Sequence, residues 1–338
     1  VNYNVPEGSY STDPARGEVR IRELKELVQS LHRQGFRVIM DVVYNHTYHQ
    51  DSWLERAVPG YYYRAWTDGS WSNGSGCGND VASERSMCAK YILDSVLYWA
   101  EEYHMDGFRF DLMGLLDTDL MERIRAALDE RFGRGEKLMF GEPWAAGPTA
   151  RKRGVQLADK KALAELDPEI GAFCDGVRDA VKGPVMYREK PGFVNGGSGF
   201  EKRILHSITA WCGQARNFRA AAPSQTITYL SSHDDMTLWD KLVVTMDPQQ
   251  NFDDPAPQVM RASRLAAAIY MTCQGRLFLL SGEEFGRTKQ GEDNTHKAPI
   301  ELNRLDWERA WQNRELVEYY QGLIALRKQL PALCDKSE

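Results

Sequence analysis

Hydrophobic positions along the chain follow two alternating patterns. Apolar residues recur at helical spacing in Val19–Gln34, Arg85–His104, Leu120–Phe132, Val259–Thr272 and Leu316–Leu330. Short apolar runs typical of buried strands occupy Phe36–Val43, Gly107–Asp111, Lys137–Gly141, Thr226–Leu230, Arg276–Leu280 and, more weakly, Ala172–Val177. This alternation predicts about six strand–helix units that build a parallel sheet with helices outside it. An α/β fold follows, and both a doubly wound sheet and about three quarters of a barrel fit the pattern.

The length of the chain sets its domain organisation. Its 338 residues suit one large domain or two smaller ones, and a barrel of roughly 250 residues or more fits within them. A polar loop rich in Gly and Ser extends from Tyr44 to Ala82, but no linker between domains and no internal repeat is visible. We therefore predict that residues 1–338 belong to a single domain.

Charge and hydropathy exclude two classes of protein. The formal charge is −6 with both signs interspersed, which does not favour a nucleic-acid surface. No run of 18 apolar residues occurs, so we expect no membrane span. Aromatic residues make up 11% of the chain and include nine Trp, which is more than a minimal core needs. Such aromatic side chains often form stacking platforms for ligands.

The six cysteines are scattered and none stands in a CxxC pair, so we expect neither a zinc site nor a disulfide framework. Reduced thiols favour a cytoplasmic protein. The chain begins VNYNVPEG, without an initiator Met and without the charged and apolar regions of a signal peptide. This start resembles the middle of a loop, and we expect the chain to be a fragment.

Acidic residues follow the ends of several predicted strands. They are Asp41 after RVIM, Asp111 after GFRF, Glu142 after LMFG and Asp234 after YLSSH. In a parallel α/β barrel the carboxyl ends of the strands form one active face, so these carboxylates are expected to converge there. Arg109, His46 and His233 accompany them.

An acidic barrel mouth suits either divalent-metal chemistry or glycoside hydrolysis. Arg109 precedes Asp111 by two residues, and on a strand this spacing puts both side chains on one face. The guanidinium would keep the carboxylate ionised and oppose metal binding. Trp144 follows Glu142 by two residues, and an apolar indole would raise the pKa of a general acid. The pattern favours glycoside hydrolysis, and a metal-dependent hydrolase ranks last.

Four short segments carry a resemblance to a known family. They are DVVYNH at Asp41–His46, DGFRFDLMG at Asp106–Gly114, GEPW at Gly141–Trp144 and YLSSHDD at Tyr229–Asp235. In sequence and in order they resemble the conserved segments of the α-amylase superfamily. YNVPEGSYST at Tyr3–Thr12 is similar to the segment characteristic of the type I pullulanases within it. The likeness extends from Val1 to about Leu330.

The resemblance implies roles for the matched residues. Asp111 would be the nucleophile and Glu142 the general acid and base of a retaining hydrolase. Asp234 would stabilise the transition state, and His46 and His233 would hydrogen-bond the sugar in the cleaved subsite.

The remaining matched residues would support these. Arg109 would orient Asp111, Asp41 would act through a hydrogen-bond network, and Trp144 would shape the acceptor side. Asp235 stands where the family usually has Asn and is expected to contact substrate. Asn45 is either a loop cap or a calcium ligand as in some amylases. No cofactor is required, and Ca²⁺ is at most a structural ion.

The implied fold is a (β/α)8 TIM barrel that lacks its first two βα units and the C-terminal β domain. We expect such a chain to be poorly stable or inactive on its own. The implied activity is hydrolysis of α-1,6 linkages in α-glucan polysaccharides and oligosaccharides. Two alternatives remain: an α-1,4-acting amylase or glucanotransferase with the same site, and an inactive glycan-binding fragment.

Overall fold

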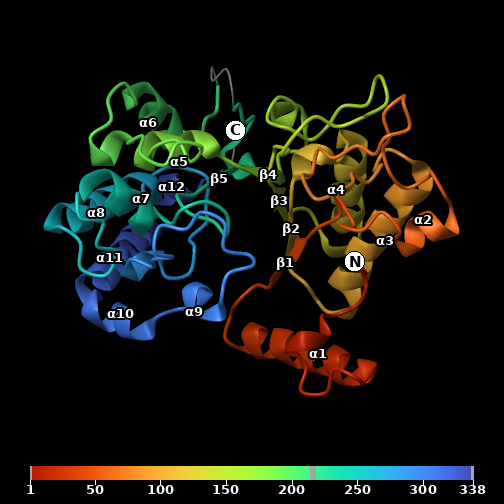
Figure 1. Cartoon of the computed structure of the whole chain (residues 1–338), viewed down its shortest axis with the longest axis horizontal. Coiled ribbons are helices and arrows are strands. Elements are labelled where there is room, and N and C mark those ends of the chain that lie inside the picture. Colours follow the sequence, from red (N-terminus) through yellow and green to blue (C-terminus); the bar gives the residue numbers. More distant parts are fainter. Residues whose placement is uncertain (1, 214–217, 336–338) are drawn as a thin grey trace. The chain divides into compact units, whose positions relative to one another are not determined.

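The computed structural model describes residues 2–213 and 218–335. The chain divides into two compact units between Ala172 and Phe173, and each unit is described by itself. Figure 1 gives the labels of the helices and strands used below.

The first unit is built on parallel strands that follow one another in chain order. They are β1 (Ile39–Val42), β2 (Gly107–Phe110), β3 (Leu138–Gly141) and β4 (Ile170–Phe173), whose last residue begins the second unit. Every residue of β2 and of β4 is buried. Both strands are therefore covered on both faces.

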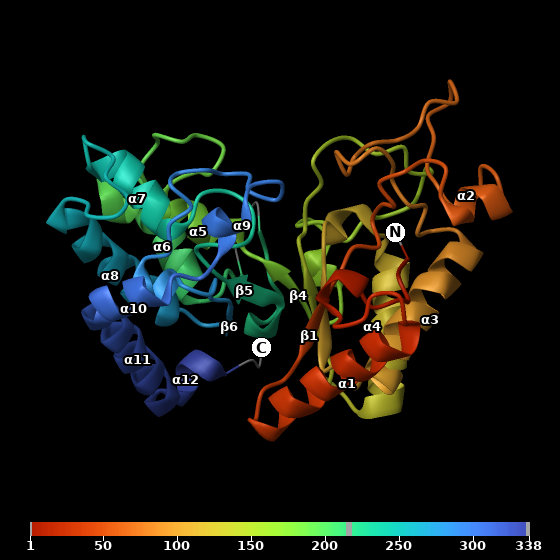
Figure 2. The same cartoon turned by 60° about the horizontal axis from the view of Figure 1, so that its bottom comes forward.

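The first unit also contains helices. They are α1 (Gly17–Arg33), α2 (Trp53–Ala57), α3 (Ser86–Glu102) and α4 (Thr118–Phe132). Figures 1 and 2 show α3 and α4 side by side along the strands. The apolar side chains of α3 and α4 are buried at helical spacing, as Ile92, Val96 and Trp99 illustrate on α3.

The second unit contains a short parallel pair, β5 (Thr226–Thr228) and β6 (Arg276–Leu277). Its helices are α5 (Asp175–Lys182), α6 (Glu201–Ile208), α7 (Leu238–Met246), α8 (Pro257–Met271), α9 (Ile300–Asn303), α10 (Trp307–Gln312), α11 (Arg314–Gln329) and α12 (Pro331–Cys334). Both α7 and α11 pack against α8. The predicted α/β fold with a parallel sheet is confirmed, and the described residues contain six strands.

Two predicted strands extend well beyond the observed ones. The run Arg276–Leu280 forms a strand only to Leu277. The apolar run Ala172–Val177 continues as a strand only to Phe173, and α5 begins at Asp175. Helix α7 was not predicted from the sequence, because most of its residues are buried and no polar face marks the helical period. Among the described residues no helix is both long and apolar enough to cross a membrane.

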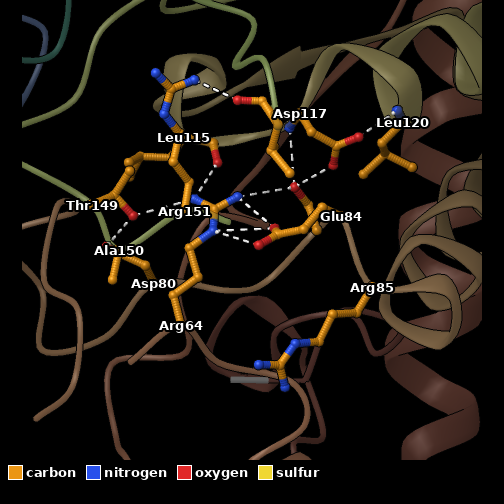
Figure 3. A network of polar contacts seen from close by, with 12 residues as sticks. Arg64, Asp80, Glu84, Arg85, Leu115, Asp117, Leu120, Thr149, Ala150 and Arg151 are labelled. Carbon is orange, nitrogen blue, oxygen red and sulfur yellow. Dashed lines mark hydrogen bonds and ion pairs between the residues drawn. The ribbon is translucent and has the colours of Figure 1, made fainter. Parts of the chain in front are cut away.

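Asp117 caps α4 and joins it to the loop before α3. Its carboxylate accepts from the Leu120 N–H at 3.0 Å, as Figure 3 shows, and from the Ser83 hydroxyl at 2.6 Å. We expect Asp117→Ala to lower the free energy of unfolding by about 2 kcal/mol, because a cap and a buried hydrogen bond are both lost. Urea unfolding of the full-length gene product measures this.

Asp119→Ala is the matched control for the Asp117 test. Asp119 lies in the same helical turn, but its side chain is 79% exposed and only forms a 3.7 Å ion pair with Arg123. An exposed pair contributes about 1 kcal/mol at most. Equal losses in the two variants would contradict the role of Asp117 as a cap.

Candidate active site

One guanidinium joins three carboxylates at the carboxyl ends of β1, β2 and β3. The Nη1 of Arg109 donates to Asp41 Oδ1 at 2.8 Å and to Asp111 Oδ1 at 2.9 Å. Its Nη2 donates to Glu142 Oε1. The strand register explains this arrangement, since Asp41 pairs with Arg109 across β1 and β2, and Arg109 pairs with Phe140 of β3. The predicted juxtaposition of Arg109 and Asp111 is present in the structure.

The charge of Arg109 is secured by its acidic neighbours. Burial opposes the positive charge, but Glu142, Asp41 and Asp111 outweigh it and raise the pKa of the guanidinium above its ordinary value. The Arg109 side chain is 8% exposed, whereas that of Asp41 is 59% exposed. A permanently charged and largely buried guanidinium therefore lies between the predicted nucleophile and the predicted acid.

Both carboxylate oxygens of Glu142 are engaged. Oε1 accepts from Arg109, and Oε2 accepts from the backbone N–H of Leu112 at 3.0 Å. The Glu142 carbonyl accepts from the Gly114 N–H at 2.8 Å. Hydrogen bonds thus join the turn after Asp111 to Glu142, the residue that follows β3. A Cβ on Gly114 would lie 2.6 Å from backbone atoms of Trp144, so only glycine allows this approach.

Asn45 completes the surroundings of Asp111. Its Nδ2 donates to the Asp111 carbonyl at 2.8 Å and to Asp111 Oδ2 at 3.0 Å. Both partners are acceptors, so the amide nitrogen must face them and Oδ1 must face His46 Nδ1, at 2.6 Å. His46 thus uses one lone pair of that oxygen, and the calcium alternative for Asn45 stays a prediction.

His46 lies in surroundings that favour the neutral form of its imidazole. Burial lowers the pKa of His46, and the charge of Asp111 opposes this only in part. If Nδ1–H donates to Asn45, then Nε2 is left as an acceptor. Tyr3 donates its hydroxyl to the His46 carbonyl at 2.8 Å and fixes the backbone there. Tyr3 belongs to the N-terminal segment on which the subfamily resemblance rests.

Trp144 is half-buried, and its ring lies 5.7 Å from the Lys160 amine. Its expected roles beside Glu142 and on the acceptor side stay predictions.

In the second unit, His233, Asp234 and Asp235 follow β5. His233 Nε2 lies 3.5 Å from Asp234 Oδ1, and both side chains are more than half exposed. The Lys289 amine donates to the His233 carbonyl at 3.0 Å. These two side chains are therefore open to a ligand, while the hydrogen bond from Lys289 fixes the backbone at His233.

The Asp235 side chain is less exposed than those of His233 and Asp234. Its φ of 64° is left-handed, and its carboxylate lies 3.7 Å from Arg178 Nη1. Burial raises the pKa of Asp235, and the charges of Arg178 and Lys182 oppose the rise. Lys182 donates to the adjacent Met236 carbonyl at 2.8 Å. Two buried cations of α5 thus hold the turn that carries Asp234.

Sequence reasoning missed Arg178 and Lys182. They stand four residues apart on α5, and each directly follows a buried valine, Val177 or Val181. A helical reading of this segment would have put both cations near one face. The predicted strand ended at Val177, and no helix was predicted over residues 178–182.

The predicted residues therefore form two groups, one in each unit. The first comprises Asp41, His46, Arg109, Asp111, Glu142 and Trp144, and the second comprises His233, Asp234 and Asp235. Asn45 joins the first group, and Arg178 and Lys182 join the second.

Comparison with known proteins gives a consistent result. No protein-family model matches the chain. The chain is 41% identical to the pullulanase of Bacillus subtilis over 98% of its own length and 45% of that protein. It is 30% identical to the glycogen debranching enzyme of Serratia proteamaculans over 93% of its length and 49% of that enzyme. The chain spans less than half the length of these curated relatives.

A solved structure also resembles the chain. This is the crystal structure of the pullulanase from Paenibacillus barengoltzii in complex with maltohexaose and α-cyclodextrin. The TM-score is 0.91 and the sequence identity 45%, over 99% of this chain and 51% of that one.

Lys182 makes stability depend on pH. Burial, reinforced by Arg178, lowers the pKa of this fully buried amine to about 8. Between about pH 8 and the unfolded pKa near 10.4, the unfolded state binds more protons, so stability rises with pH by up to about 1.4 kcal/mol per unit. We expect this rise of the free energy of unfolding with pH to be absent in Lys182→Met.

Urea unfolding of the full-length gene product at about pH 7.5 and 9.5 tests the linkage. Lys241 has a similarly lowered pKa and remains in both proteins, so the difference between wild type and Lys182→Met is the relevant quantity. Lys202→Met, at an exposed position on α6, is the control. A difference that does not change with pH would contradict the assignment.

Proposed function

Because this chain is homologous to pullulanases along nearly its whole length, we propose that it carries the catalytic residues of a retaining glycoside hydrolase. Its substrates would be α-1,6-glucosidic branch linkages in pullulan, glycogen or starch-derived α-glucans. The observation that carries the proposal is the shared guanidinium of Arg109, which holds Asp111 and Glu142 on neighbouring strands. Retaining hydrolysis requires such a pair of carboxyl groups.

In the first step, Asp111 would attack the anomeric carbon and Glu142 would protonate the departing C6 oxygen. The bond between carbon and leaving oxygen breaks as the bond to Asp111 forms. Asp111 is supported on one oxygen by Arg109 and on the other by Asn45. Its carboxylate is therefore oriented before substrate arrives, which lowers the cost of reorganisation.

In the second step, Glu142 would take a proton from water, and the resulting hydroxide equivalent would displace Asp111 from the sugar. The Leu112 N–H and Arg109 both donate to Glu142 and would stabilise its ionised form in this step. Water is the co-substrate, so the reaction needs no organic cofactor.

The other predicted residues have supporting roles in the proposal. Asp234 would bind sugar hydroxyls and stabilise the cationic transition state, and its exposure together with that of His233 suits such contacts. His46 would accept a hydrogen bond from the sugar through Nε2. Trp144 would stack at the acceptor side, and Asp235 would contribute near Asp234.

We further propose that both units belong to one catalytic domain with the architecture of a (β/α)8 barrel. The parallel pairing within each unit supports this. A structural calcium ion and a cytoplasmic location remain part of the proposal, and no residue is assigned to the ion.

Pullulan digestion by the full-length gene product tests the activity. We expect maltotriose as the main product, with loss of at least about a thousandfold in Asp111→Asn, because an amide cannot form the glycosyl-enzyme. Panose, isopanose or mixed maltodextrins would instead indicate an α-1,4-acting amylase or glucanotransferase. Binding of pullulan without cleavage would leave the glycan-binding alternative.

Asn45 gives a second prediction. In Asn45→Ala, Asp111 loses a donor to its charged carboxylate, which contributes about 1.5–3 kcal/mol. We expect kcat on pullulan to fall about 10- to 100-fold while KM changes little.

Asn79→Ala controls for loosening of the loop around Asn45. Asn79 accepts from the Thr47 N–H at 2.9 Å but has no described contact with Asp111. If Asn79→Ala lowered kcat as much as Asn45→Ala, the effect would belong to the loop, and the orienting role of Asn45 would be wrong.

A further inference from the structure

Arg64 is a buried cation far in sequence from the predicted catalytic residues. Its side chain is 1% exposed, and Nη2 lies 2.8 Å from Oε2 of Glu84, to which Nε also donates at 3.1 Å. A buried charge is costly unless it is paired and its remaining hydrogen atoms are bonded. Figure 3 shows this guanidinium between Glu84, Leu115 and Thr149.

The remaining donors of Arg64 reach a different part of the first unit. Nη1 donates to the Leu115 carbonyl at 2.8 Å and to the Thr149 hydroxyl at 3.3 Å. Thr149 in turn donates to Asp80 at 2.7 Å. Asp80 is also fully buried and accepts from the backbone of Gly74 at 2.7 Å, so the polar loop is internally closed. Arg64 therefore links this loop to the segment that follows β2.

Leu115 ends the short turn η2 (Met113–Leu115) directly after Asp111 and Leu112. Leu112 has φ 39° and ψ 49°, a left-handed conformation that costs a leucine about 1 kcal/mol or more and persists only where its surroundings hold it. Its carbonyl accepts from the Leu115 N–H at 2.8 Å. Its own N–H donates to Glu142 Oε2, so this strained residue supplies one of the two described donors of that carboxylate.

We propose that Arg64 is a positioning residue for the general acid. By holding the Leu115 carbonyl, it keeps the Leu112–Leu115 turn in the conformation that points the Leu112 N–H at Glu142. The inference rests on the proposed function only in naming Glu142 the acid.

A distinct chemical signature follows. A backbone N–H that donates to a carboxylate favours the ionised form, so a displaced turn raises the pKa of Glu142. Among the described contacts, the charged groups joined to Glu142 are Arg109 and, through it, Asp41 and Asp111. None of them contacts Arg64 in the described structure, so their effect is common to wild type and variants.

The test uses Arg64→Lys and Arg64→Met in the full-length gene product, with pullulan as substrate. Lysine keeps the charge but cannot reach Glu84 and Leu115 with separate nitrogens. We expect kcat to fall about tenfold or more with KM within about threefold, and the alkaline limb of the pH profile to move up by about 0.5–1 unit. Glu84→Gln, which keeps the shape of the pair, should have a smaller effect in the same direction.

A second measurement does not depend on turnover. The carboxyl carbon of Glu142, assigned by comparison with Glu142→Gln, is titrated by ¹³C NMR in wild type and in Arg64→Lys. We expect the titration midpoint of Glu142 to be about 0.5–1 pH unit higher in Arg64→Lys than in wild type. If wild type does not cleave pullulan, the proposed function fails, whereas this titration still decides the positioning role.

Arg85→Met is the matched control. Arg85 belongs to the same loop and donates to the Gly60 and Tyr61 carbonyls, away from η2. It should destabilise the loop without moving the Glu142 titration. The proposal is overturned if Arg64→Lys and Arg64→Met only lower the melting temperature, with the pH profile and the titration unchanged, or if Arg85→Met shifts both equally.

Discussion

The first unit depends on the contact of Arg109 with Asp41, Asp111 and Glu142. Three carboxylates on adjacent parallel strands repel one another unless a cation stands between them. The guanidinium is suited to this because its nitrogen atoms diverge in one plane and serve several acceptors at once. Its position requires Asp41 opposite Arg109 in the strand register. A slip of one residue would turn these side chains to the other face, so strand pairing and chemistry are specified together.

A second feature is that the polar atoms around these carboxylates are themselves held. Asn45 is oriented by His46, and the Leu112 N–H is directed by a turn that Gly114 packs against Trp144. Preorganised donors lower a barrier because they need not reorient as charge develops. The supporting groups come from loops rather than strands, so the precision of the site depends on how these loops are tied down.

The carboxyl ends of β1, β2 and β3 and the pairing of Arg109 with Asp111 followed from the sequence, because period two and the geometry of parallel sheets are local rules. Asn45 could not be assigned in that way, since its partner lies 66 residues further along the chain. Lys182 was missed because the apolar run before it was read as a strand ending at Val177, so the helix that continues to Lys182 was not predicted. Arg64 was missed because a charge in a Gly-rich loop is ordinarily solvated, and its burial depends on tertiary contacts.

The burial of Arg64 also has a consequence for folding. Burying the Arg64 guanidinium is costly unless both Glu84 and the Leu115 carbonyl are in place, because a desolvated charge with incomplete partners is unfavourable. The loop before α3 and the turn after β2 must therefore order together rather than in succession. One buried guanidinium thus couples two distant segments, through its salt bridge to Glu84 and its hydrogen bond to the Leu115 carbonyl.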